Sequence, residues 1–255
     1  MRGIPWLSLG VLLLAGARVS GQSVEFRVDT DVFVGEEKEP FAENVTIFKA
    51  GLVYDFPLSG PREITVFDPS RGRFVLLDGE RQVKTTLTTQ ELLEFVAAMK
   101  VHAEERGGLF AAAADPQFEQ QFDNTTGWVA LQAPKIRYRA RGQQPELELA
   151  PARYREFADW YARLNATRPG SLPPFARIEL NRVMAERGWI PGEVELTLES
   201  QEQQRNRRVV LRSRHFPFWR LSATDHKRLE EAGTQLAQFR AVSFTEYRQG
   251  WQQAR

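Results

Sequence analysis

Segments in which apolar and polar residues alternate place the strongest constraint on the fold of this chain. Residues 24–34 alternate at a period of two, which is typical of a strand that buries one face. The turn sequences at 68–72 (Asp-Pro-Ser-Arg-Gly) and 78–79 (Asp-Gly) favour antiparallel hairpins. The chain therefore predicts an antiparallel sheet. Its other strands are expected at 44–49, 52–56, 63–67, 73–77, 83–87, 128–131, 135–141, 146–149, 193–199, 207–215 and 242–244.

Helices are predicted between these strands. Thr88 and Glu91 match a capping box that opens the first helix, and Gly107 ends it. Helical spacing of apolar residues and capping signals predict about four helices in total. The fold class expected is therefore α+β, an antiparallel sheet packed by these helices. The first of the four helices begins after Thr88, the second and third span 151–168 and 173–188, and the fourth begins after Ser222.

The first 21 residues predict export. A basic start precedes a short apolar run at 4–17 and then small residues, which is the layout of a secretory signal peptide. Cleavage is expected before Gln22, or alternatively after Ala17. A membrane anchor is the other reading, but the run is shorter than the ~20 apolar residues of a spanning helix. We expect residues 22–255 to form a single α+β domain, with 109–127 as the boundary if there are two domains. The mature protein is expected to be secreted or periplasmic and to have no membrane span.

Composition and motifs argue against most catalytic classes. The chain has no cysteine, so thiol catalysis, zinc–thiolate sites and a lipoprotein anchor are excluded. Its 34 basic and 33 acidic residues argue against a nucleic-acid partner held by bulk charge. No Gly-x-Ser-x-Gly or phosphate-binding glycine motif occurs. His102, His215 and His226 are isolated in sequence, so we predict no catalytic residue, no metal and no cofactor.

Aromatic residues near the end of the 207–215 strand are the candidate ligand contacts. The segment His-Phe-Pro-Phe-Trp at 215–219 is dense in aromatic rings, and Trp189 adds another. Such rings usually fill cores, but they also line ligand clefts. The residues predicted to contact a ligand are Trp189, Phe216, Phe218 and Trp219.

Charged strands predict cross-strand pairing. Glu193, Glu195 and Glu199 match the spacing of Arg208, Arg212 and Arg214 on the following strand, and opposite charges across a sheet stabilise it. Arginines in 135–141 are expected to face glutamates in 146–149 in the same way. The alternative reading of the basic cluster at 205–214 is a surface for an anionic partner.

One stretch resembles a known family. Residues 53–56 (Val-Tyr-Asp-Phe), 64–68 (Ile-Thr-Val-Phe-Asp), 73–78 (Arg-Phe-Val-Leu-Leu-Asp) and 83–87 (Val-Lys-Thr-Thr-Leu) run as strand, Asp turn, strand ending in Leu-Asp, strand. Over residues 44–88 this pattern resembles the bacterial lipoprotein-carrier superfamily (LolA/LppX-like half-barrels). The resemblance implies a curved, half-barrel-like sheet closed by helices over an apolar cavity, an envelope location and a hydrophobic ligand. The chain is longer than the carriers, and no residue matches their conserved arginine.

We therefore predict an exported, non-catalytic protein that binds a lipid-like or hydrophobic small molecule, or an envelope protein. A binder of this kind needs a cavity on the scale of ~300–1,000 Å3. The first alternative is a structural or interaction protein with a filled core and no ligand. The second is a hydrolase with a site assembled from distant residues, in which a histidine meets a hydroxyl or carboxylate within about 3 Å.

Overall fold

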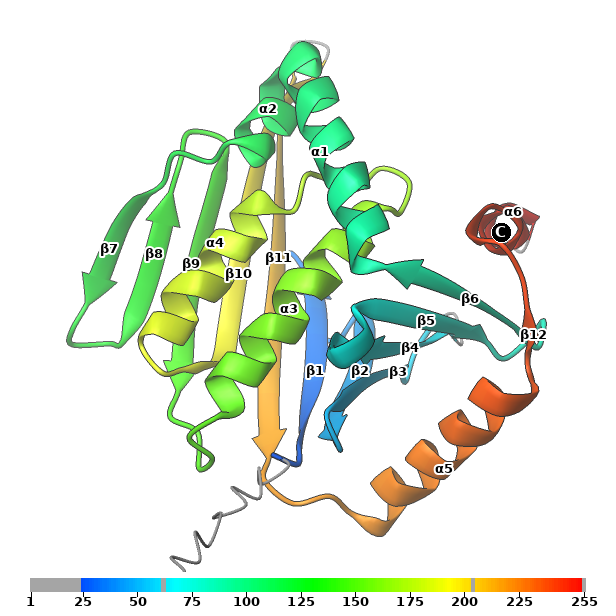
Figure 1. The fold of residues 1–255 in the computed structure, drawn as a ribbon. Coiled ribbons are helices and arrows are strands. Elements are labelled where there is room, and N and C mark those ends of the chain that lie inside the picture. Colours follow the sequence, from blue (N-terminus) through cyan, green and yellow to red (C-terminus); the bar gives the residue numbers. More distant parts are fainter. Residues whose placement is uncertain (1–23, 61–62, 203–204, 254–255) are drawn as a thin grey trace, which may run out of the picture.

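A single open sheet runs through the structure, which is a computed structural model. It describes residues 24–60, 63–202 and 205–253, so the predicted signal peptide, residues 1–21, lies outside the described residues. The sheet order is β12-β6-β5-β4-β3-β2-β1-β11-β10-β9-β8-β7 (Figure 1). The strands are β1 (Phe26–Val34), β2 (Ala42–Lys49), β3 (Leu52–Pro57), β4 (Glu63–Asp68), β5 (Arg73–Asp78), β6 (Val83–Thr88), β7 (Glu119–Asp123), β8 (Trp128–Gln132), β9 (Ile136–Gln143), β10 (Ile190–Glu202), β11 (Arg205–Phe218) and β12 (Arg240–Ala241).

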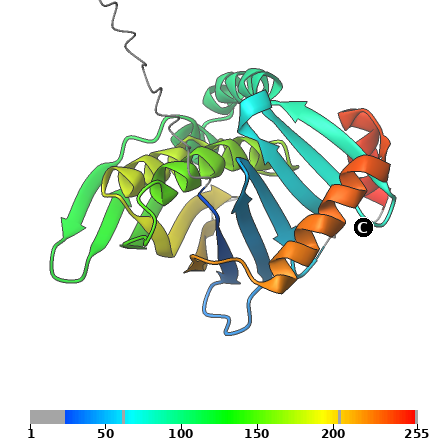
Figure 2. The same cartoon turned by 60° about the horizontal axis from the view of Figure 1, so that its bottom comes forward.

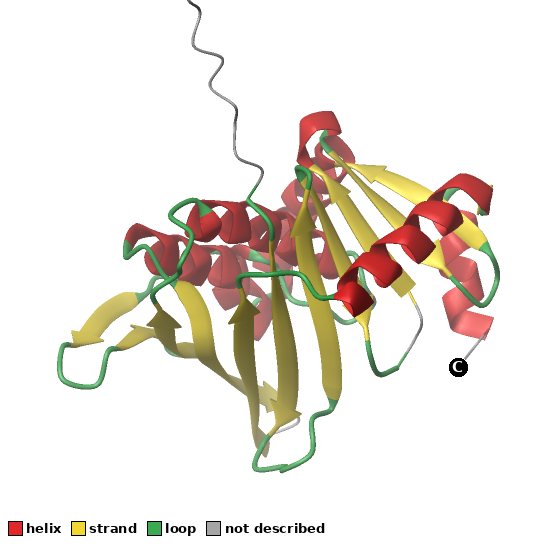
Figure 3. Ribbon diagram, turned by 90° about the horizontal axis from the view of Figure 1, so that it is seen from below, coloured by secondary structure: helices red, strands yellow, loops and turns green. Residues whose placement is uncertain are grey.

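The sheet is curved and almost entirely antiparallel. Only the short edge strand β12 pairs in parallel, with β6, among the strands of the described ranges. Its two halves, β1–β6 and β7–β11, meet where β1 pairs with β11, so segments at opposite ends of the chain lie side by side. Figure 3 shows the sheet bending around a group of helices. The prediction of an α+β fold with a curved antiparallel sheet is confirmed.

The concave face of the sheet is covered by α1 (Thr89–Arg106), α2 (Gly108–Ala114), α3 (Ala150–Ala166) and α4 (Phe175–Glu186) (Figures 1 and 3). Aromatic stacking forms the core beneath α3. The rings of Phe26 and Phe48 lie 4.2 Å apart, and Phe157 of α3 meets Phe48 edge-on at 5.9 Å. Burial of each such ring stabilises the fold by about 1.5–3 kcal/mol. The capping box predicted at Thr88 and Glu91 opens α1 as expected.

The convex face of the β1–β6 half is covered by α5 (Ala223–Gln238), which Figure 2 shows lying across the outside of those strands. Ala232 of α5 is fully buried against Val45, Ile47 and Phe56. Ser222 caps the helix and forms a capping box with Asp225, and Arg27 of β1 donates to Asp225 at 3.0 Å. The ion pair between Arg27 and Asp225 and the apolar contacts of Ala232 therefore hold α5 on the sheet.

The convex face of the other half carries charged ladders. The predicted register is confirmed: Glu193, Glu195 and Glu199 lie opposite Arg214, Arg212 and Arg208. The ion pairs in these ladders, however, run to β9, where Arg141 contacts Glu193 at 3.2 Å and Arg137 contacts Glu199. Exposed pairs of this kind contribute about 0–1 kcal/mol each.

Four sequence predictions require correction. Residues 146–149 form no strand, and β9 pairs with β10 instead. The strand β7 was not predicted. Residues 242–244 form no strand, because 242–243 connect β12 to α6 (Phe244–Gln253) and Phe244 begins that helix. The described ranges contain six α-helices instead of four, because α2 and α6 were missed. None of the helices in the described ranges has the length and hydrophobicity needed to span a bilayer.

Candidate functional site: a cavity beneath α3 and α4

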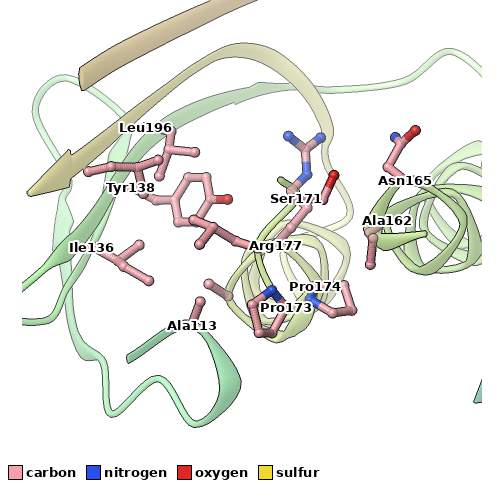
Figure 4. A pocket seen from close by; sticks show the side chains of 14 residues that line it. Ala113, Ile136, Tyr138, Ala162, Asn165, Ser171, Pro173, Pro174, Arg177 and Leu196 are labelled. Carbon is pink, nitrogen blue, oxygen red and sulfur yellow. The ribbon is translucent and has the colours of Figure 1, made fainter. Parts of the chain in front are cut away.

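A cavity of about 200 Å3 lies between the sheet and the start of α4. The sheet contributes side chains from β9 and β10, and α2, α3, α4 and the α3–α4 connection close it from the other side (Figure 4). Most of the wall is aliphatic. The lining residues are Ala113, Ile136, Tyr138, Ala162, Asn165, Ala166, Ser171, Leu172, Pro173, Pro174, Ala176, Arg177, Leu196 and Leu198.

The apolar floor of this cavity continues along the sheet. Leu196 and Leu198 lie directly opposite Leu211 and Val209 on β11, and Leu211 lies opposite Val34 on β1. Directly opposed residues point to the same face of a sheet. Val34 is 38% exposed and Val209 is 44% exposed. These five residues, here called the apolar strip, therefore extend from the cavity to the surface.

Among the described residues, Arg177 is the one cationic side chain that lines the cavity. It belongs to the first turn of α4, and Figure 4 shows its guanidinium pointing into the gap between the sheet residue Tyr138 and Asn165 of α3. Its Nε donates to Asn181 Oδ1 at 3.0 Å. In the described part of the chain, no carboxylate forms an ion pair with it.

Asn181 holds this arginine in place. The Asn181 side chain is buried, with 4% of its surface exposed, and its amide nitrogen donates to Asp159 Oδ1 of α3 at 2.8 Å. Asp159 is itself 3.5 Å from Arg155. Arg177 lies one helical turn before Asn181. The hydrogen bonds from Arg177 to Asn181 and from Asn181 to Asp159 therefore link the guanidinium to α3 and fix its orientation.

A polar cluster surrounds the buried His215 on the concave face. His215 Nδ1 lies 3.1 Å from Thr30 Oγ1 and 3.4 Å from the Tyr154 hydroxyl, and His215 Nε2 lies 2.9 Å from Ser213 Oγ. Burial, together with the positive charge of Arg177, lowers the pKa of His215 to about 3. The imidazole is therefore neutral at physiological pH.

The Ser213–His215 contact meets the distance expected of a hydrolase, but its chemistry does not fit that role. A general base works best with a pKa near the operating pH, whereas the pKa of His215 lies near 3. Its second nitrogen faces the hydroxyls of Thr30 and Tyr154 rather than a carboxylate. Neither Ser213 nor His215 lines the cavity.

A second buried cluster is centred on Asp55. Its carboxylate accepts hydrogen bonds from Thr46 at 2.7 Å, Asn44 at 2.5 Å and the Tyr161 hydroxyl of α3 at 2.8 Å. Burial raises the pKa of Asp55 despite these bonds. All three donors to Asp55 come from within the fold. The bond from Tyr161 attaches α3 to the sheet.

The four aromatic residues predicted as ligand contacts do not form one site. Phe216 and Phe218 lie on the convex face, where each is more than 40% exposed and Arg27 stacks 4.3 Å above the Phe218 ring. Trp219 packs on Phe26 in the concave core, with ring centroids 5.8 Å apart. Trp189 packs near Phe122 at 5.8 Å, at the β7 side of the sheet. None of the four lines the cavity.

A wider groove of about 800 Å3 runs between the start of α3 and the end of α4. Its lining mixes apolar side chains with charged ones, and both of its arginines are paired with carboxylates. Arg153 contacts Glu156 at 3.2 Å, and Arg155 contacts Asp159 at 3.5 Å. The groove therefore offers a ligand no unpaired arginine among its lining residues.

The residues that the structure describes contain no group of three or more potential metal ligands. The chain matches no protein-family model, and no curated protein matches it.

Sequence reasoning missed the cavity residues. Arg177 is one of several arginines in this part of the chain, and no local signal marks it as a cation that lines a cavity. The proline pair at 173–174, used to predict the start of a helix, was the available signal for this corner of the fold.

Proposed function

We propose that this protein is an exported, non-catalytic binding protein that holds a hydrophobic or lipid-like ligand in the cavity beneath α3 and α4. The observation that carries the proposal is the continuity between an apolar cavity and the partly exposed apolar strip, which gives a ligand a route from the surface. Exposed apolar surface next to a cavity is typical of a binding site.

The size of the cavity favours a second candidate. Its volume of about 200 Å3 lies below the ~300–1,000 Å3 of most ligand sites. A structural or interaction protein with a nearly filled core, in which the strip contacts an envelope protein, would have a cavity of this size. The two candidates differ in whether a small molecule occupies the site.

Native mass spectrometry of the full chain, purified from the cells that export it, separates them. A co-purifying apolar molecule on a chain that begins at Gln22 is the expected result. A bare mass in repeated preparations, or a chain that keeps residues 1–21, would contradict the proposal.

A cavity-filling variant provides the matched comparison. Ala162 lines the cavity from α3, so Ala162→Phe should displace the bound mass without changing export. Ala237 is exposed on α5, far from the cavity, and Ala237→Phe should leave the bound mass unchanged. Equal occupancy in both variants would place the ligand elsewhere.

A further inference from the structure

We infer that the ligand of this cavity carries a carboxylate, and that Arg177 binds that group. This inference rests on the proposed function and adds the chemical class of the ligand, a small anionic amphiphile. It follows from the unpaired charge of Arg177, the fixed direction of its guanidinium, the start of α4 and the volume of the cavity.

No carboxylate among the described residues pairs with Arg177. Two other arginines on the same two helices have one: Arg155 lies 3.5 Å from Asp159, and Arg182 lies 2.6 Å from Glu179. Within the described ranges, Arg177 has only the neutral amide of Asn181 as a partner. A partly buried cation in apolar surroundings is costly unless an anion or water compensates it. A ligand anion would supply that compensation.

The free end of Arg177 has the geometry for a carboxylate. Its Nε is occupied by Asn181, so the two terminal nitrogens remain as a planar fork. Such a fork donates two parallel hydrogen bonds to the two oxygens of a carboxylate. Because Asn181 is buried and bonded to Asp159, the fork is held in place before a ligand arrives.

The start of α4 adds to the positive potential. Pro173, Pro174 and Ala176 line the cavity beside Arg177. The N-cap position is Pro174, whose side chain makes no capping hydrogen bond to the first turn. The N-terminus of a helix favours an anion.

The remaining wall selects a small apolar body. Ile136, Leu172, Leu196 and Leu198 surround the rest of the space. An apolar cavity of ~150 Å3 is large enough for benzene, so this cavity accommodates a ring or a short alkyl chain next to the charged group. A longer chain would extend over the apolar strip.

Isothermal titration of the purified protein with hexanoate, 1-hexanol and hexyl phosphate tests the inference. The first two probes share a chain length and differ in charge. We expect hexanoate to bind about 10- to 100-fold more tightly than hexanol, since charged hydrogen bonds contribute about 1.5–3 kcal/mol. Arg177→Gln should remove this preference and leave hexanol affinity unchanged, and Arg177→Lys should retain part of it.

Arg139→Gln is the matched control, because Arg139 is exposed on the opposite face of β9 and stacks on Trp128 at 4.9 Å. It should behave as the wild type, and thermal unfolding should show that every variant is folded. Equal binding of hexanoate and hexanol, or a preference that survives in Arg177→Gln, would overturn the inference and leave the proposed function standing. Tighter binding of hexyl phosphate would overturn the carboxylate assignment. Binding of none of the probes would overturn the inference and the proposed function together.

Discussion

Asn181 Oδ1 accepts a hydrogen bond of 3.0 Å from Arg177 Nε, and this contact orients the cation that lines the cavity. The two residues are four positions apart on α4, so they lie on the same face of the helix. Asn181 is anchored in turn by Asp159 of α3. The direction of the guanidinium is therefore decided by the packing of two helices.

Removal of that anchor should weaken ligand binding without removing charge. In Asn181→Ala, Arg177 keeps its charge but gains rotational freedom, and ordering one side chain costs about 0.5–1.5 kcal/mol. We expect hexanoate affinity to fall about two- to tenfold while hexanol affinity stays the same. Titration calorimetry with both probes measures this difference. An equal loss for both probes would indicate a general structural defect instead.

Substitution of His215 should change how stability depends on pH. The pKa of His215 in the fold is about 3, lowered by burial and by Arg177, whereas the unfolded chain takes up this proton near pH 6.5. Stability should therefore fall as pH drops below 6.5, with a slope of up to ~1.4 kcal/mol per pH unit from this residue. Urea unfolding of the wild type and His215→Gln between pH 6.5 and 4.5 should show a shallower slope for the variant.

Asp55 and Arg177 are the other charged groups near this cluster. Both are present in the wild type and in His215→Gln, so their contributions to the pH dependence of stability cancel in the comparison. Identical slopes would mean that His215 is protonated in the folded protein at mildly acidic pH.

Loss of the charge on Asp225 should loosen α5. Burial alone would raise the pKa of Asp225, but hydrogen bonds from Ser222 and Arg27 lower it overall. Its stabilisation is thus present above the unfolded pKa of an aspartate and lost as pH falls through the lower folded value. Asp225→Asn should destabilise the protein by about 1–3 kcal/mol at neutral pH and raise amide exchange in α5. Lys227→Gln, an exposed neighbour, should stay within about 0.5 kcal/mol of the wild type.

Ser213 should resist reagents that label serine nucleophiles. The His215 partner is too weakly basic to activate the hydroxyl at 2.9 Å. Incubation with a fluorophosphonate probe, followed by peptide mass spectrometry, should find Ser213 unmodified. Stoichiometric labelling that is lost in His215→Gln would instead support the hydrolase.

Much of the local structure could be predicted because its signals are local. The hairpin at Asp78-Gly79 and the capping box at Thr88 and Glu91 depend on neighbouring residues, and both predictions are confirmed. The register of Glu193–Glu199 with Arg208–Arg214 is also confirmed, because the two strands are adjacent in sequence. The pairing of β9 with residues 146–149 was wrong. The Glu-Leu-Glu-Leu alternation there has the same period as β10, and period alone does not select a partner.

The sequence by itself determined the fold class and the faces of the strands, since alternation, caps and turns act over a few residues. Only the tertiary structure decided that β1 joins β11, and that α3 and α4 enclose a cavity with Arg177 unpaired in it. The missing counter-ion is a property of the space around the guanidinium. That space is formed by residues 113 to 198 as they pack together, and no short stretch of sequence encodes it.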